Sequence, residues 1–80
     1  MTTFERDGFS YEATAIYEPA ENGYPAGWIV EIGEVKIENM FEIIDAYGIK
    51  EAFAMFEDIY GWIEENESDD IVETSREMYE

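Results

Sequence analysis

The 80-residue sequence contains no cysteine and no histidine. Without cysteine there is no disulfide bond, no zinc–thiolate site and no thiol nucleophile. Without histidine, serine–histidine and cysteine–histidine catalysis lack their imidazole base. No other catalytic motif is present, so we expect a protein that is not an enzyme.

Positive charge is also scarce, because four basic residues face 21 acidic ones and the net charge is −17. A chain this negative is repelled by nucleic acid and by anionic membrane surfaces, so we expect neither as a direct partner. No apolar run approaches the roughly 20 residues that cross a bilayer. The first residues lack the basic and apolar regions of a signal peptide. We therefore expect a cytoplasmic protein.

Apolar residues are plentiful despite the charge. They make up 46% of the chain, and 16% of all residues are aromatic, which favours a folded protein over a disordered one. A chain of this length forms one domain, so we expect residues 1–80 to be a single compact unit.

The first half of the chain has the two-residue period of β-strands. Residues 9–18 alternate well, and residues 19–27 contain the Pro and Gly residues of a loop. Alternation resumes at Trp28 and is interrupted at Gly33. This glycine either opens a tight hairpin turn or marks a bulge in one long strand. The hairpin is favoured, which gives about three antiparallel strands within residues 9–39.

From residue 40 the apolar period changes to about 3.6 residues, which is typical of helices. Asn39 is a plausible N-cap for a first helix that ends at Gly48. A second helix follows and bends or ends at Gly61. After a break over residues 64–67, Ser68 caps a last helix. The sequence thus predicts an α+β fold in which two or three helices over residues 40–80 pack on one face of a small antiparallel sheet.

The acidic residues concentrate near the C-terminus. Residues 57–80 contain ten acidic residues and one arginine. Residues four apart on a helix are about 6 Å apart along its axis, a spacing comparable to that of phosphates along a nucleic-acid strand. Asp69, Glu73 and Glu77 have this spacing. Such a surface is either a solubilising feature or a mimic of nucleic acid that binds a basic groove.

We expect the partner-binding residues to be mainly carboxylates of this C-terminal half. The first set is Glu57, Asp58, Glu64, Glu65, Asp69, Asp70 and Glu73. A second set, from the polar edge of the sheet, is Glu12, Glu31, Glu34 and Glu38. Trp62 lies off the main apolar stripe of its helix, so it is either a core residue or an aromatic anchor of the interface.

Catalytic and metal sites are not expected among these carboxylates. Acidic neighbours such as Glu64 and Glu65 diverge by about 100° on a helix and do not converge on one substrate. The acidic stretch 66–73 lacks the central glycine and the ligand spacing of an EF-hand loop. We expect no metal ion and no cofactor.

In size, acidity and strands-before-helices order, the chain resembles the small acidic anti-defence proteins of phages and mobile elements. These include anti-CRISPR proteins and anti-restriction DNA mimics. The resemblance implies an inhibitor that works in the host bacterial cytoplasm and blocks target DNA binding. Its partner would be the basic nucleic-acid-binding groove of a CRISPR surveillance complex or a restriction enzyme. It carries over no individual residue, because no diagnostic motif accompanies it.

Two other functions are compatible with the same sequence. One is an acidic immunity or regulatory protein that binds a basic toxin or enzyme through a few aromatic hot spots. The other is a phage structural or assembly component in which the charge provides solubility.

Overall fold

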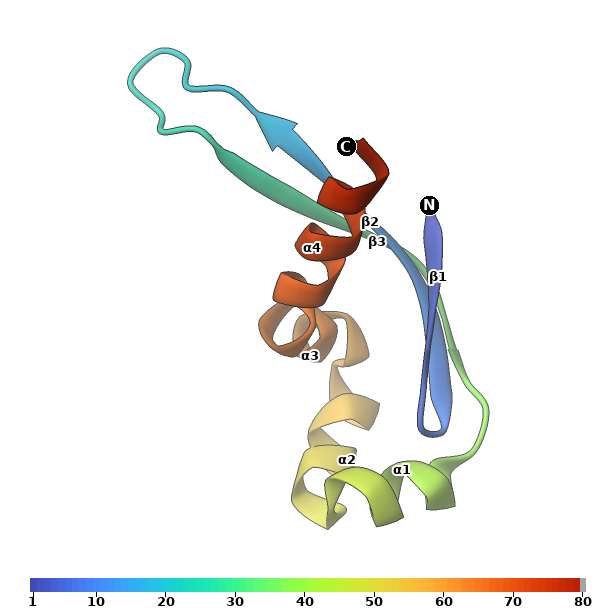
Figure 1. Cartoon of the computed structure of the whole chain (residues 1–80). Coiled ribbons are helices and arrows are strands. Elements are labelled where there is room, and N and C mark those ends of the chain that lie inside the picture. Colours follow the sequence, from blue (N-terminus) through green and yellow to red (C-terminus); the bar gives the residue numbers. More distant parts are fainter. Residues whose placement is uncertain (80) are drawn as a thin grey trace.

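In the computed structural model, which describes residues 1–79, three strands precede four helices (Figure 1). The strands are β1 (Thr2–Arg6), β2 (Phe9–Glu18) and β3 (Gly27–Ile37). The helices are α1 (Met40–Tyr47), α2 (Ile49–Glu57), α3 (Ile59–Asn66) and α4 (Ser68–Tyr79). The strands form one antiparallel sheet in the order β1-β2-β3. The predicted α+β class is confirmed, with one or two more helices than expected.

The three strands differ from those predicted. β1 was missed, although the Asp7–Gly8 pair that joins it to β2 is a strong hairpin signal. The predicted hairpin at Gly33 is wrong, because β3 runs through this residue as one strand. The alternative, a bulge, is correct: the register shifts between the pairs Tyr11–Val35 and Ala13–Ile32.

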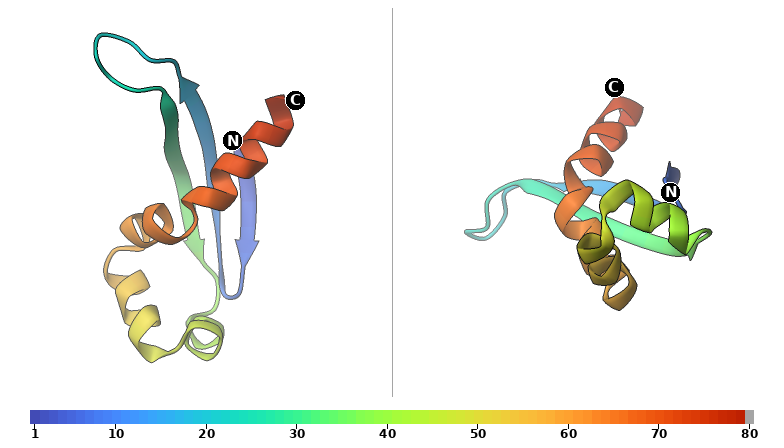
Figure 2. Two further views of the ribbon diagram at one scale, coloured as in Figure 1. Left: turned by 60° about the vertical axis from the view of Figure 1, so that its left-hand side comes forward. Right: turned by 90° about the horizontal axis from the view of Figure 1, so that it is seen from below.

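The sheet buries one face under the helices, and α4 crosses that face (Figure 2). Alternate residues of β2 point toward the helices, as the sequence predicts. Phe9, Tyr11, Ala13 and Ala15 are buried, and the ring of Phe4 on β1 stacks on Tyr11 at 5.1 Å between centroids. The helices complete the core with Ile43, Ala52, Met55, Ile63 and Ile71.

The distal part of the β2–β3 hairpin, residues 16–29, extends beyond the helices; we call it the arm (Figure 1). The molecule measures 45 × 25 × 17 Å, and its radius of gyration is 14.3 Å. A globular chain of this length has a radius of about 12 Å, so the structure is elongated. Tyr17, which alternation places on the same face as Tyr11 and Ala15, is therefore 53% exposed, and its ring contacts Trp28 edge-on at 5.4 Å.

Capping side chains set the helix boundaries. The Asn39 side chain accepts hydrogen bonds from the amides of Phe41 and Glu42, as expected for the N-cap of α1. Gly48 ends α1 with φ of 90°, which confirms the second predicted boundary.

The second predicted helix is divided at Asp58 and not at Gly61. The Asp58 carboxylate accepts a hydrogen bond from the Gly61 amide at 3.1 Å and so caps α3. A side chain at Gly61 would collide with this carboxylate. The later break is confined to Glu67, and Ser68 begins α4, but its hydroxyl donates to the Glu64 carbonyl instead of capping the helix.

Arg6 joins β1 to the junction between α3 and α4. Its Nε donates to Glu67 Oε1 at 2.5 Å, and its Nη2 lies 3.2 Å from Asp70 Oδ2. The Glu67 side chain is 11% exposed and that of Arg6 is 26% exposed. Burial lowers the pKa of Arg6, but the hydrogen bond and charge of Glu67 outweigh it and the net pKa is raised. The Arg6 guanidinium therefore stays protonated at every physiological pH.

A second side chain of α4 closes the open edge of β2. Thr2 pairs with Ala13, so β1 no longer accompanies β2 at Ala15. The buried Ala15 amide donates instead to the Ser75 hydroxyl at 2.9 Å. Ser75 is only 5% exposed, so the Ala15 amide depends on this hydroxyl and not on solvent for its acceptor.

Replacing Arg6 leaves the buried Glu67 carboxylate without its cation. We expect Arg6→Ala to lower the free energy of unfolding by about 2–3 kcal/mol, measured by urea denaturation. Lys36→Ala removes the same charge from an exposed position and should change the free energy of unfolding by less than about 0.5 kcal/mol. Equal effects of the two variants would contradict a specific role for the ion pair.

Removing the Ser75 hydroxyl leaves the Ala15 amide buried without an acceptor. Ser75→Ala should lower the free energy of unfolding by about 1–2 kcal/mol and reduce the hydrogen-exchange protection of the Ala15 amide. Ser10→Ala, the same change on the other face of the sheet, is the control. Unchanged exchange at Ala15 would show that another group satisfies this amide.

Candidate acidic binding surface

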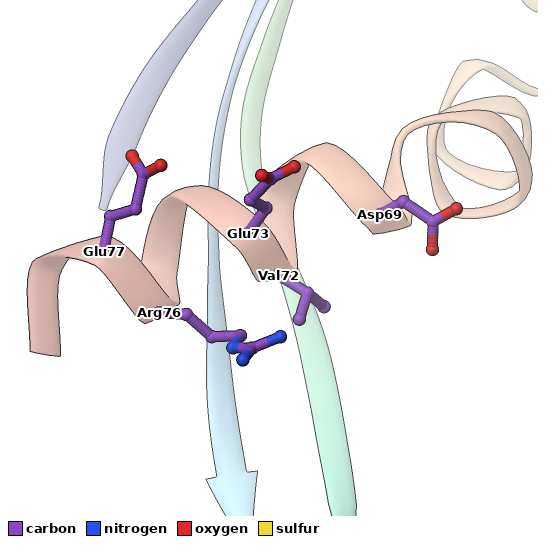
Figure 3. A pocket seen from close by; sticks show the side chains of 5 residues that line it. All are labelled: Asp69, Val72, Glu73, Arg76 and Glu77. Carbon is purple, nitrogen blue, oxygen red and sulfur yellow. The ribbon is translucent and has the colours of Figure 1, made fainter. Parts of the chain in front are cut away.

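The outer side of α4 carries a row of carboxylates. Asp69, Glu73 and Glu77 lie on successive turns of the helix and are exposed (Figure 3). Ile71 and Ser75 occupy the opposite side and are buried against the sheet. The sequence-predicted spacing of four residues therefore becomes an accessible row, at about 6 Å per step along the helix.

The row borders a shallow hollow that contains the only arginine of this helix. Val72 and Arg76 line the hollow together with the three carboxylates. Figure 3 shows Arg76 on the side of α4 next to the row. No ion pair between Arg76 and another described residue is formed, so its charge offsets part of the local negative potential.

α3 carries two more exposed carboxylates, Glu64 and Glu65, and Glu65 lines a separate small hollow with Asp58 and Trp62. We call the row on α4, formed by Asp69, Glu73 and Glu77, the acidic helical surface. Asp70, which was predicted as a binding residue, lies beside these residues, but its carboxylate pairs with Arg6. Its charge is therefore partly neutralised within the protein.

Three other predicted residues have structural roles or lie elsewhere. Glu57 is exposed at the end of α2, and Asp58 caps α3. Trp62 packs edge-on against Tyr47 and Phe9, at 5.7 and 6.1 Å between centroids. Its indole nitrogen also donates to Glu51 at 2.9 Å. These contacts favour the core interpretation of Trp62 over that of an exposed anchor.

The predicted sheet residues form a separate surface. Glu12, Glu31 and Glu34 are exposed on the strands at positions that point away from the helices. Glu12 and Glu34 line a small hollow with Lys36. Glu38 is exposed after the end of β3. The predicted carboxylates of α4 and those of the strands thus lie on opposite sides of the protein. We call the strand set, Glu12, Glu31 and Glu34, the acidic sheet surface.

Two kinds of exposed residue lie outside the predicted binding set. Glu77 continues the row, and its spacing from Glu73 was a sufficient signal. The aromatic side chains of the arm are the second kind, and Tyr24 is 77% exposed. No sequence pattern marks them as exposed, because their exposure depends on how far the helices extend along the sheet.

Burial also affects two tyrosines in the core. Desolvation, followed by the charge of Glu67, raises the pKa of Tyr11 well above its usual value of 10.0. Desolvation likewise raises the pKa of Tyr47. The Tyr11 hydroxyl has no hydrogen-bond partner of normal geometry among the described residues. Above about pH 10 the unfolded chain loses this proton first, so stability declines as the pH rises further.

Residues 1–79 contain no group of three or more acidic side chains placed to hold a metal ion. Within the same range, no helix combines the length and the apolar character needed to cross a membrane.

Comparison of the chain with protein-family models, with curated proteins and with solved structures gave no match.

Asp58 allows a structural role to be separated from a binding role. Asp58→Ala should lower the free energy of unfolding by about 1 kcal/mol, because α3 loses its cap. Asp58→Asn removes the charge but retains a capping oxygen, so urea denaturation should show little change. If both variants are equally destabilised, the charge matters more than the cap.

Proposed function

We propose that this protein is an inhibitor that binds another protein and imitates nucleic acid with its acidic helical surface. The carboxylates of this surface would pair with lysine and arginine side chains that otherwise hold phosphates. Binding would exclude nucleic acid by competition, without any chemical reaction.

The observation that carries this proposal is the exposed row Asp69, Glu73 and Glu77 on a helix anchored to the sheet. A rigid helix presents the charges at fixed spacing, so a basic groove meets them without a large loss of conformational entropy. The net charge of −17 would also steer a basic partner and accelerate association.

Within this proposal, the partner class is a basic nucleic-acid-binding groove such as that of a CRISPR surveillance complex or a restriction enzyme. Two points support this partner class. Exposed carboxylates are complementary in charge to a groove lined by lysine and arginine, and the chain resembles small acidic anti-defence proteins in size and charge. Identification of the partner is therefore the first experiment. The tagged protein is used to capture proteins from a bacterial lysate at low and moderate salt, and DNA is added as a competitor.

A second candidate function rests on the arm. Tyr17 and Tyr24 are exposed there, with Ile16 and Ile29 on the strands beside them. Tyrosine is a common hot-spot residue in protein interfaces. An acidic immunity or regulatory protein would bind a basic toxin or enzyme through these few side chains, with the carboxylates contributing mainly to the rate of association.

Charge variants of α4 distinguish the two functions once a partner has been captured. Glu73→Lys with Glu77→Lys should weaken binding about tenfold, since each contact contributes about 0.5–1 kcal/mol. Arg76→Glu should strengthen binding, because it removes the only cation of the hollow. Affinity is measured by titration at two salt concentrations, and it should fall as salt rises.

Two controls make this test specific. Glu31→Lys with Glu34→Lys makes the same charge change on the acidic sheet surface and should have a smaller effect. Tyr24→Ala tests the arm. The mimicry proposal fails if Tyr24→Ala abolishes binding while the α4 variants leave it intact, or if DNA does not displace the partner.

A further inference from the structure

α2 presents an apolar surface that the rest of the protein does not cover. Ala52 and Met55 face the core and are buried. On the outer side, Ile49 and Phe53 are each 61% exposed. They are four residues apart, so their side chains are neighbours on the helix. An aromatic and a branched aliphatic side chain are thus left together in solvent.

Charged residues stand at both ends of this apolar pair. Lys50 follows Ile49 at the start of the helix, and Glu57 is its last residue, four positions after Phe53. Both are exposed. At 100° per residue, these four side chains fall within about 100° of one another around the helix. We call Ile49, Lys50, Phe53 and Glu57 the α2 face.

This helix is also the least negatively charged of the four. Its nine residues include one lysine and two acidic residues, Glu51 and Glu57. Glu51 accepts a hydrogen bond from Trp62 and so points away from the α2 face. The α2 face itself is electrically neutral, in a chain whose net charge is −17.

We propose that the α2 face binds the α2 face of a second copy of this chain, with the two helices antiparallel. A twofold interface requires a surface that is complementary to itself. Antiparallel packing centred next to Phe53 brings the positive end of each face opposite the negative end of the other. Lys50 of each copy then lies opposite Glu57 of the other, and the two Phe53 rings meet near the axis.

Electrostatics favours this location for contact between two copies. Contact between two copies through the carboxylate row of α4 would bring like charges together. The α2 face avoids this cost and supplies two opposite-charge pairs. A strongly basic partner would gain more by binding the carboxylates of α3 and α4 than by covering a face that contains a lysine.

The available apolar area sets the strength of the association. Ile49 and Phe53 together expose roughly 230 Å² of side-chain surface. The neighbouring helices α1 and α3 also carry exposed aromatic side chains, Phe41 at 81% and Tyr60 at 51%. A standard stable interface buries about 800 Å² per partner. The structure therefore predicts a weak, reversible dimer that forms at high micromolar concentration.

The test measures the mass of the 80-residue protein by sedimentation equilibrium from 10 µM to 1 mM, in 50 and 500 mM NaCl. We expect a monomer–dimer equilibrium that strengthens with salt, because salt screens the repulsion between two acidic chains. This is the opposite of the salt dependence expected for a basic partner.

Variants locate the interface. Phe53→Glu should raise the dimer dissociation constant at least tenfold, and Ile16→Glu, a matched change on the exposed arm, should not. Lys50→Glu and Glu57→Lys should each weaken the dimer, and the two combined should restore it, since the pairs then form with exchanged charges. Lys36→Glu controls for the change in net charge. Circular dichroism checks that each variant is folded.

The proposal is overturned if the protein is monomeric at 1 mM in both salts, or if Ile16→Glu disrupts the dimer and Phe53→Glu does not. Failure of the double charge exchange to restore association would also overturn it. None of these outcomes affects the proposed inhibitor function, because the α4 variants are tested in dilute solution, where the chain is monomeric.

Discussion

The contact of Arg6 with Glu67 and Asp70 holds together parts of the chain that would otherwise repel one another. One of only four cations in the sequence is placed inside the molecule, where it joins β1 to the junction of α3 and α4. This fixes the direction in which α4 leaves the junction. Because α4 also supplies Ser75 to the edge of β2, the sheet and the acidic helical surface keep a constant relative position.

Local patterns in the sequence predicted the elements that are built locally. The alternation of β2, the Asn39 cap and the Gly48 end all depend on neighbouring residues, and each was correct. Gly33 was ambiguous, since a turn and a bulge both favour glycine, and only the pairing of β3 with β2 decides between them. β1 was missed because five residues with a charged end carry a weak strand signal.

In the candidate site, too, features set by neighbouring residues were predictable and features set by distant partners were not. The row on α4 was predictable because helical spacing is a property of one element. Asp70 forms an ion pair with Arg6, and the Asp58 carboxylate caps α3. Both interactions depend on partners that composition does not reveal. In a chain with this many carboxylates, the informative question is which of them are occupied inside the protein. The free carboxylates of α4 and those of the strands lie on opposite faces, so one groove can engage only one of these sets.

The bulge at Gly33 and the Ser75 hydroxyl have a consequence for aggregation. An exposed strand edge rich in aromatic residues is a template for fibril growth, and this sheet has β1 and β3 at its edges. The bulge interrupts the regular edge of β3 at Gly33, and the Ser75 hydroxyl occupies the Ala15 amide of β2 where β1 has ended. Both features oppose the addition of a strand from another molecule at these positions.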